Sequence, residues 1–250
     1  MRKLIPAVLM VALACSALSI QAGERYVDEA MKAPTRQADT AIDSVRHGAE
    51  ITSFAGIKPG QTVVDFIPGE GYWTRIFSGV VGAKGKVLDV WPAPLVAPGA
   101  KAENAMKALV AEKGSGKVEA VPIDLKAFSL PTPVDVFFTS QNLHDLPTPF
   151  LGGVDITAFS KQVYKALKPG GRFVVVDHAG AAGTGITQVD TLHRIEPAAA
   201  KQAVLAAGFV YKGESKVLAN PEDNHQLKVF DPAIKGHTDK FAYVFEKPAH

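Results

Sequence analysis

Hydrophobic residues along most of the chain fall into short runs that alternate with amphipathic stretches. The short apolar runs predict buried strands, and the stretches with apolar residues three and four positions apart predict helices. The predicted strands are residues 62–67, 85–91, 118–123, 134–139 and 172–177. The predicted helices are residues 72–81, 100–113, 155–167 and 197–207. Strands that alternate with helices indicate parallel βαβ units, so we expect an α/β protein with a doubly wound, mostly parallel sheet.

The last part of the chain breaks this alternation. Residues 213–218 and 240–246 both have the pattern of a strand, and no helical pattern lies between them. We expect them to form an antiparallel pair at the edge of the sheet. Residues 219–239 join them as a long polar loop, and loops of this length are usually functional or disordered.

The first 22 residues differ in kind from the rest. Arg2 and Lys3 are followed by an uncharged apolar run to about Ile20, after which the sequence turns polar. This order predicts a secretory signal peptide over residues 1–22, and therefore an exported protein with the periplasm as its expected compartment. The alternatives are an uncleaved membrane anchor, for which the run is short, and lipid attachment at Cys15.

After the signal peptide we expect an N-terminal helical extension, residues 23–55, and one domain, residues 56–250. Charged residues of both signs recur in the extension at three- and four-residue steps, which is typical of a salt-bridged face in solvent. These residues are Arg36, Asp39, Asp43 and Arg46. The whole chain has 27 Lys and Arg against 25 Asp and Glu, and Arg2 and Lys3 account for the excess. This balance excludes a broad basic surface, so we expect no nucleic-acid partner.

The composition also limits the chemistry. Cys15 is the only cysteine, so the protein without its signal peptide has no disulfide, thiolate nucleophile or Cys-ligated zinc. No other segment is long and apolar enough to span a membrane. Four polar residues of the long loop are conceivable ligands of a hard metal, but their spacing matches no metal motif, and we predict no metal. They are His225, Asp231, His237 and Asp239.

The most informative segment links the first predicted strand to the first predicted helix. Asp65 lies in the strand, and Pro68, Gly69 and Gly71 follow before the helix. Glycine permits a positive φ and the close approach of a ligand to the backbone, and doubly wound sheets bind nucleotides at this strand end. Thr74 stands where a dinucleotide motif has its third glycine, which argues against a nicotinamide oxidoreductase, and there is no Walker loop.

This segment resembles motif I of the class I S-adenosylmethionine-dependent methyltransferases, Asp-x-Gly-x-Gly-x-Gly. Asp65, Gly69 and Gly71 match three of its four marked positions, and Ile67 stands in place of the first glycine. Residues 167–177 resemble the turn and fifth strand of the same family, and the reversed final strand pair also agrees. More narrowly, the chain is similar to a group of predicted exported methyltransferases.

The resemblance implies the class I methyltransferase fold, S-adenosylmethionine as cofactor and a small-molecule methyl acceptor. In this family an acidic residue at the end of the second strand holds the ribose. Here Trp91 takes that position, so either Asp89 reaches the ribose in a shifted register or the contact is absent, and Trp91 could stack on adenine. Asp124 would accept from the adenine amino group, or it caps a helix. The implied cofactor-binding residues are Asp65, Pro68, Gly69, Gly71, Asp89, Trp91, Asp124 and Asn142.

Methyl transfer requires mainly positioning and a dry pocket, with a general base where the acceptor must lose a proton. His144 and His178 follow the fourth and fifth strands at the expected active edge, and we predict them as the catalytic acid–base residues. The alternatives are a hydrogen-bonded loop residue and a polar strand end. We predict that His193 and Arg194 bind the acceptor, Arg194 as a clamp for an acidic group, with a surface salt bridge as the alternative.

Export motivates a second hypothesis, because adenosyl cofactors are made in the cytoplasm. The protein would then be an exported, non-catalytic small-molecule-binding protein on the same fold, with Trp91 as the mark of a degenerate cofactor site.

Overall fold

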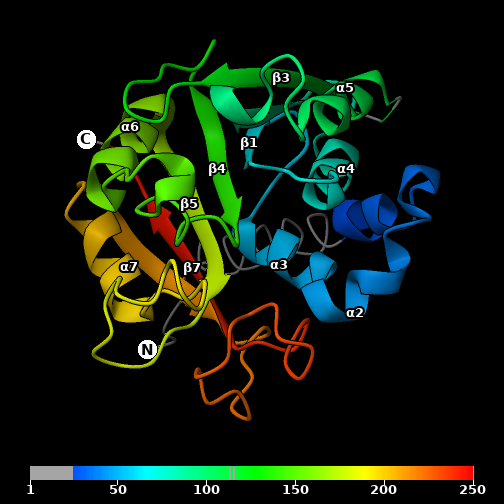
Figure 1. Cartoon of the computed structure of the whole chain (residues 1–250). Helices are drawn as coiled ribbons and strands as arrows, with labels where there is room; N and C mark the ends of the chain where they lie inside the picture. Colours follow the sequence, from blue (N-terminus) through cyan, green and yellow to red (C-terminus); the bar gives the residue numbers. More distant parts are fainter. Residues whose placement is uncertain (1–24, 113, 115, 250) are drawn as a thin grey trace, which may run out of the picture.

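A seven-stranded sheet runs through the centre of the protein (Figure 1). The computed structural model describes residues 25–112, 114 and 116–249, so the signal peptide predicted for residues 1–22 lies outside the described part. The strands are β1 (Thr62–Phe66), β2 (Lys86–Pro92), β3 (Lys117–Ile123), β4 (Val134–Ser140), β5 (Leu167–His178), β6 (Val210–Ser215) and β7 (Lys240–Glu246). Their order across the sheet is β3-β2-β1-β4-β5-β7-β6.

The strand directions confirm the predicted fold class. β1 pairs in parallel with β2 and β4, β2 pairs in parallel with β3, and β4 pairs in parallel with β5. β7 runs antiparallel to both β5 and β6. The sheet is therefore mostly parallel, with the predicted antiparallel pair at one end and β6 on the outside.

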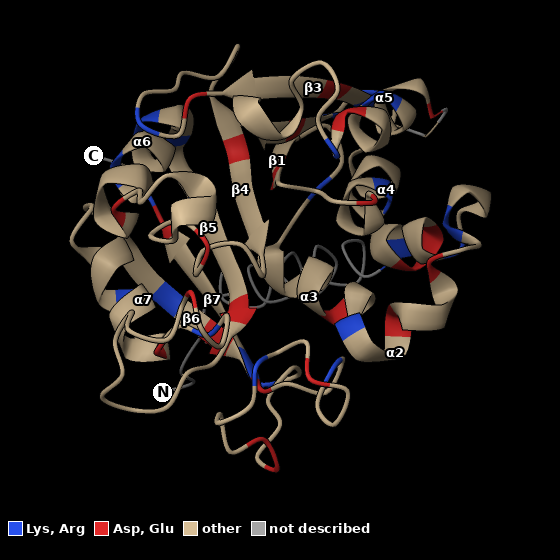
Figure 2. Ribbon diagram, in the orientation of Figure 1, with Lys and Arg blue, Asp and Glu red and all other residues tan. Residues whose placement is uncertain are grey.

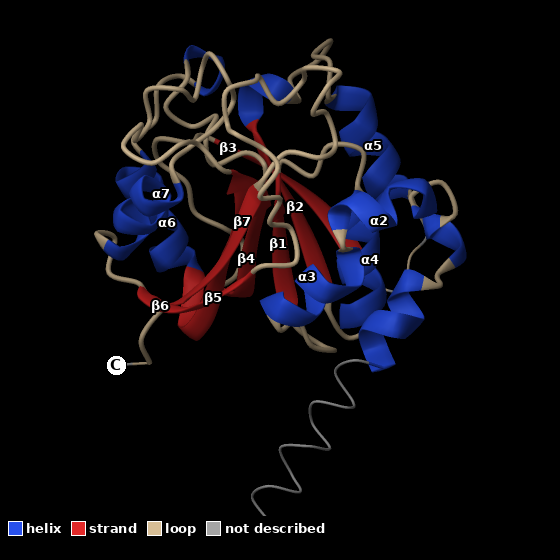
Figure 3. Cartoon of the chain, turned by 90° about the horizontal axis from the view of Figure 1, so that it is seen from below, coloured by secondary structure: helices blue, strands red, loops and turns tan. Residues whose placement is uncertain are grey.

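Helices cover both faces of the sheet (Figure 3). They are α3 (Gly48–Ala55), α4 (Tyr72–Val81), α5 (Glu103–Ala111), α6 (Ile156–Ala166) and α7 (Pro197–Leu205). Successive side chains of β1 point to opposite faces: Val63 packs on the side of α3 and α4, and Val64 packs on the side of α6 and α7. Because both faces are buried, the inner strands are apolar runs without a polar face, as the sequence shows.

Local sequence accounts for the helix ends. α4 follows Gly71 and ends at Gly82, both at positive φ, and its bounds match the prediction. At the start of α6 the side chain of Asp155 accepts a hydrogen bond from the backbone N–H of Ala158, which is a normal N-cap. Pro197 occupies the first turn of α7, where its missing N–H carries no cost.

β5 and β6 begin several residues earlier than predicted, because pairing partners extend them. Gly170 donates a backbone hydrogen bond to Lys247, and Lys247 donates one to Gly171, so β5 includes the predicted glycine turn. β6 starts at Val210, which pairs with Glu246 of β7.

The N-terminal extension is not the solvated face predicted from its charge spacing. It consists of residues 25–31, η1 (Pro34–Arg36), η2 (Thr40–Ile42), α2 (Asp43–Arg46) and α3, and Figure 2 shows acidic and basic residues side by side on its short helices. Asp39 is buried and accepts two hydrogen bonds of 2.7 Å from Arg75 of α4. Arg36 is fully buried and donates to Asp43. The Asp39–Arg75 pair holds the extension against the domain, and the Arg36–Asp43 pair lies within the extension.

The long loop after β6 is held to the domain by several hydrogen bonds. Asp239 at its end accepts from the backbone N–H of Asn220 at 2.8 Å and donates its own N–H to Asp223 at 2.7 Å. Arg194 binds the same Asp223. Of the two expectations for this loop, disorder is therefore wrong. Within residues 25–112, 114 and 116–249, no helix has both the length and the apolar character needed to cross a bilayer.

Candidate functional site

The parallel strands bring most of the predicted site residues to one edge of the sheet. Phe66 at the end of β1 lies in register with Val90 of β2 and Thr139 of β4, and Ser140 of β4 lies in register with Val176 of β5. The segments that follow these strands therefore share the carboxyl edge, where open α/β sheets bind their ligands.

The loop between β1 and α4, residues 67–71, turns by means of positive φ angles at Ile67, Gly69 and Gly71 (54°, 59° and 84°). A β-branched residue in this region is rare and strained, and Ile67 occupies the position where the resembling motif has glycine. A Cβ on Gly71 would collide with Leu109 of α5, whereas a Cβ on Gly69 would meet nothing. Gly71 is therefore required by both conformation and packing, and Gly69 by conformation alone.

Beneath this loop, Thr74 of α4 lies between two carboxyl groups. Its Oγ1 is 2.8 Å from Asp65 Oδ2 and 2.9 Å from Asp89 Oδ1, and all three residues are buried. A hydroxyl has one proton to donate, so the second contact requires a proton on the other carboxyl. Burial raises the pKa of Asp65 to about 7, and burial together with the charge of Asp65 raises the pKa of Asp89 to about 8.

The end of β2 is filled with apolar side chains. Trp91 is 1% exposed and packs with Val96 and Leu109, with Ile67 against the same cluster. Its indole N–H is buried and has no hydrogen-bond partner among the described residues. The adenine stacking predicted for Trp91 and the ribose contact predicted for Asp89 are both unavailable in this conformation, because neither side chain is exposed.

Two cavities lie at the carboxyl edge, one at the ends of β2 and β3 and one at the ends of β4 and β5, so that β1 lies between them in the sheet. The first, here called the β2–β3 cavity, has a volume of about 460 Å³ and is lined by the segments after these strands, including Leu95 and Asp124, and by Phe150. Asp124 Oδ1 also accepts a hydrogen bond from the backbone N–H of Lys126 at 2.9 Å. Asp124 therefore stabilises a turn and lines the cavity, and because no helix follows it, the predicted helix-capping alternative is wrong.

The second, the β4–β5 cavity, has a volume of about 290 Å³. Its lining includes Trp73 from the first turn of α4, Gln141 after β4, His178 at the end of β5, Lys240 of β7, and Arg46 from the N-terminal extension. Burial lowers the pKa of Lys240 to about 8. Together with Lys235, which also lines it, the cavity therefore has three basic side chains, which suits an anionic group of a ligand.

Asn142 joins the loop to β4. Its side-chain N–H donates to the carbonyl oxygens of Phe66 at 3.1 Å and Ser140 at 2.8 Å. It thus fixes the end of β1, where the loop begins, relative to the end of β4.

His178 is placed where a catalytic residue would be needed. Its ring lines the β4–β5 cavity, and its Nδ1 lies 2.8 Å from Thr238 Oγ1. Burial lowers its pKa well below the usual value, with the positive charge of Lys240 adding to the effect. The imidazole is therefore neutral at neutral pH and is able to accept a proton.

His144 is not placed to be a general base. Its Nδ1 lies 2.7 Å from Asp177 Oδ1, and its Nε2 lies 3.2 Å from Asp145 Oδ1. Burial alone would lower the pKa of His144, but Asp177 and Asp145 raise it to about 10. Without another cation, the ring is protonated at neutral pH and has no lone pair to accept a proton, so the predicted base role is wrong for this state.

The predicted clamp at Arg194 is also wrong. Arg194 is fully buried, and it binds both carboxylate oxygens of Asp223, at 2.8 and 3.1 Å. It also donates to the backbone oxygens of Ala179 and Leu227. Its donors therefore hold the loop of residues 216–239 to the end of β5 and do not face a ligand.

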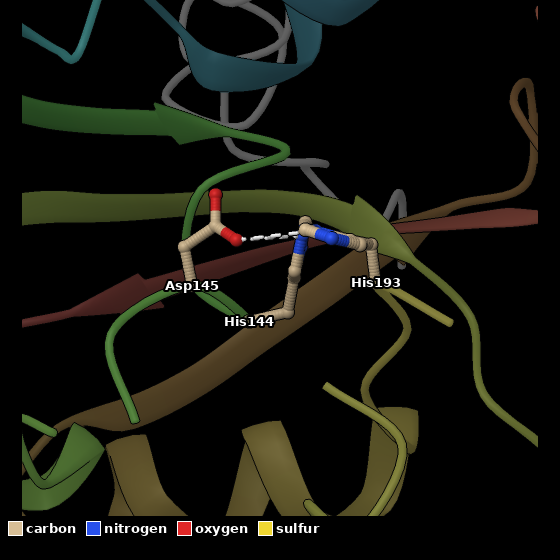
Figure 4. Close-up of side chains that lie close together, drawn as sticks. All are labelled: His144, Asp145 and His193. Carbon is tan, nitrogen blue, oxygen red and sulfur yellow. Dashed lines mark ion pairs between the residues drawn. The ribbon is translucent and has the colours of Figure 1, made fainter. Parts of the chain in front are cut away.

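His193 lies with His144 and not in a cavity wall. Its ring packs on Phe230, with centroids 4.9 Å apart, and its Nδ1 is 3.4 Å from Asp145 Oδ1. The ligand atoms of His144, Asp145 and His193 all lie within 4.8 Å of one another (Figure 4). The four loop residues considered for a metal do not belong to this cluster. Two of them pair with each other: His225 Nε2 lies 2.9 Å from Asp239 Oδ2.

The sequence does not single out Arg46, Gln141 or Lys240 as cavity residues. The charge spacing predicts a solvated face for Arg46, and the pattern of residues 240–246 predicts only a strand at Lys240. Gln141 has a φ of 61°, which is uncommon for a residue other than glycine, and no sequence pattern signals it. Burial of these residues depends on contacts between segments far apart in the chain.

No protein-family model matches the chain, and no curated protein matches it. Solved structures do match. A SAM-dependent methyltransferase from Aquifex aeolicus is 17% identical, with a TM-score of 0.55, over 89% of this chain and 97% of that chain. The putative methyltransferase in complex with the Haloferax volcanii Trm112 activator is 16% identical, with a TM-score of 0.56, over 89% and 97%.

The 4+2 cyclase SpnF is similar to the same degree, at 15% identity and a TM-score of 0.55 over 82% of this chain and 81% of that chain. At these identities the likeness shows the fold, and it confirms the predicted class I methyltransferase architecture. One fold supports more than one reaction, so the function has to be argued from the site.

Proposed function

We propose that the protein transfers a methyl group from S-adenosylmethionine to a small-molecule acceptor. The observation that supports this most directly is the loop of residues 67–71, which turns with three positive φ angles at the end of β1, between the two strand pairs whose following segments line the two cavities. The adenosyl end and the amino-acid end of the cofactor each need one such space, and the cofactor must approach the backbone between them closely.

The residues in the two cavities fit the two ends of this cofactor. Asp124 in the β2–β3 cavity would accept a hydrogen bond from the adenine amino group. Arg46 and Lys240 in the β4–β5 cavity would hold the carboxylate of the amino-acid end or an acidic group of the acceptor. The cofactor, when bound, supplies a methyl group already activated on a sulfonium.

The remaining work for the protein is positioning and proton removal. Asn142 fixes the loop to the end of β4. His178 is neutral and faces the β4–β5 cavity, so it would accept the proton that an acceptor hydroxyl or amine must lose. We propose His178 as the catalytic base in place of the pair predicted from the sequence.

A second candidate function is favoured by the packing at the end of β2. Trp91 and Leu109 cover the ribose position and Gly71, so an adenosyl ligand requires α5 to shift outward. A protein that no longer binds the cofactor would keep this cover closed and bind an anionic small molecule in the β4–β5 cavity alone.

Export is part of both proposals and rests on the pattern of residues 1–22. It is tested by mass spectrometry of the protein recovered from the periplasm, for which we expect Gly23 as the first residue. Recovery with residues 1–22 still attached would contradict it.

The main test is calorimetric titration with S-adenosylmethionine and S-adenosylhomocysteine. We expect binding by the wild type and a loss of about 10- to 100-fold in affinity in Asp124→Ala, since a hydrogen bond to a charged group contributes about 1.5–3 kcal/mol. Asp231→Ala is the matched control, because Asp231 makes the same turn hydrogen bond, to the N–H of Ala233 at 2.9 Å, in the loop after β6. Absence of heat with folded protein would favour the second candidate.

A further inference from the structure

Three side chains capable of binding a metal lie close together near the ends of β4 and β5 (Figure 4). His144 and Asp145 follow β4, and His193 lies in the segment between β5 and α7. Asp145 Oδ1 is 3.2 Å from His144 Nε2 and 3.4 Å from His193 Nδ1. Two imidazole nitrogens and one carboxylate oxygen therefore face a common point.

Hydrogen bonding does not account for this arrangement. Asp145 Oδ1 is buried and has no hydrogen-bond partner among the described residues. Both nitrogens lie farther away than the roughly 2.7–2.9 Å of a charge-assisted hydrogen bond. A buried carboxylate oxygen without a partner is costly. Among the ion pairs of the described part of the chain, Asp145 has only these two histidines as partners.

The distances are those found between ligands of one metal ion. In a tetrahedral site with bonds of about 2.0–2.1 Å, neighbouring ligand atoms lie about 3.3 Å apart. The two contacts of Asp145 Oδ1 fall on either side of that value. Imidazole nitrogen and carboxylate oxygen are ligands of zinc and its neighbours in the first transition row.

Asp177 supplies an independent observation. Its Oδ1 binds His144 Nδ1 at 2.7 Å, and its Oδ2 accepts the backbone N–H of His144 at 2.8 Å. These two bonds fix the ring so that Nε2 points at Asp145. A histidine that binds a metal usually has its other ring nitrogen on a carboxylate in this way, so the orientation of His144 is that of a metal ligand.

We propose that His144 Nε2, Asp145 Oδ1 and His193 Nδ1 bind one divalent transition-metal ion of the zinc class, with Asp177 as the positioning residue for His144. Three protein ligands leave a coordination position for water or an oxygen atom of a bound small molecule. The side chains of Asp145 and His193 are 15% and 23% exposed, so solvent reaches the site.

The site also adjoins the β4–β5 cavity. The ring of His144 lies 5.9 Å from that of His178, and the ring of His193 packs on Phe230. Both His178 and Phe230 line the cavity. The inference does not depend on methyl transfer, because it concerns ligands that the proposed cofactor does not need.

The test is titration of the purified, untagged protein with Co²⁺, after treatment with a chelator. We expect one Co²⁺ per chain, with a visible absorption spectrum of a four- or five-coordinate ion, displaced by Zn²⁺. Asp145→Asn and His193→Asn should weaken binding by more than about 100-fold, and Asp177→Asn by about 10- to 100-fold. Asn is chosen for His193 because it tolerates the φ of 55° at this position.

His237→Ala is the control, since His237 is an exposed histidine outside the cluster, and it should bind Co²⁺ as the wild type does. Circular dichroism of each variant shows whether it is folded. Failure of the folded wild type to bind Co²⁺ or Zn²⁺ would overturn the proposal. So would binding that survives unchanged in both Asp145→Asn and His193→Asn. Loss of S-adenosylmethionine binding would bear only on the proposed function.

Discussion

Asp65 and Asp89 lie opposite one another in the parallel register of β1 and β2 and share the hydroxyl of Thr74 between their carboxyl groups. Both are buried, with a single hydroxyl proton between them. At least one of the two carboxyls therefore keeps its proton at pH values where an exposed aspartate is ionised. This buried pair underlies the first prediction.

We expect the Asp65–Asp89 pair to make stability fall as the pH rises. Both folded-state pKa values are raised, to about 7 and about 8, so between the unfolded value near 4 and about pH 8 the native state binds more protons than the unfolded state. The pair contributes its full stabilisation to the native state below about pH 4, and this stabilisation is lost progressively as the pH rises to about 8. Asp89→Asn removes one ionisation and should stabilise the protein relative to wild type at pH 8, on the order of 2 kcal/mol, but little at pH 4.

Urea unfolding at several pH values measures this difference. Asp28→Asn, which changes an exposed aspartate of the N-terminal extension, should leave the pH profile unchanged. An Asp89→Asn profile parallel to that of the wild type would show that the pair does not retain a proton.

Leu109 provides a test of the cover over the glycine loop. Leu109→Ala removes the side chain packed against Gly71 and Trp91, so it should cost about 2–5 kcal/mol in stability. If α5 must shift outward for the cofactor to bind, the same change should tighten S-adenosylhomocysteine binding by about 10-fold. The reason is that the shift of α5 then disrupts fewer packing contacts than in the wild type. Leu167→Ala, at the start of β5, should destabilise the protein without changing affinity.

The Arg194–Asp223 pair should control the order of the loop of residues 216–239. Arg194→Ala leaves Asp223 buried without its partner, which costs about 3–5 kcal/mol. The loop should then be cut by trypsin at Lys228 or Lys235 much faster than in the wild type. Lys212→Ala breaks an exposed pair with Glu246 and should cost less than about 1 kcal/mol without faster cleavage. Equal cleavage rates in the two variants would contradict the anchoring role.

Lys240 should make ligand affinity depend on pH. Burial lowers its pKa to about 8, so its positive charge in the β4–β5 cavity is present below that pH and is lost above it. Binding of S-adenosylhomocysteine, measured from pH 7 to 9, should weaken through about pH 8 in the wild type. The slope should flatten in Lys240→Met, whereas Lys212→Met, at an exposed position of β6, should keep it.

The elements and their order can be predicted from the amino-acid sequence. α4 matches its predicted bounds, and the strand predictions agree to within a few residues, because apolar periodicity and glycine or proline at element ends act through neighbouring residues. The loop of residues 67–71 was also evident, since its glycines, strand and helix lie within one short segment. The positive φ of Ile67 was not evident, because a β-branched residue rarely adopts it.

Which polar residues meet depends on how the elements pack together. Arg46 and Lys240 reach one cavity from opposite ends of the chain, and His193 joins His144 and Asp145 across the whole of α6 and β5. The spacing of Arg36, Asp39 and Asp43 was visible, but their burial was not, because burial depends on what packs against a side chain. Local pattern sets secondary structure, whereas charge environment and ligand geometry arise from contacts between distant segments.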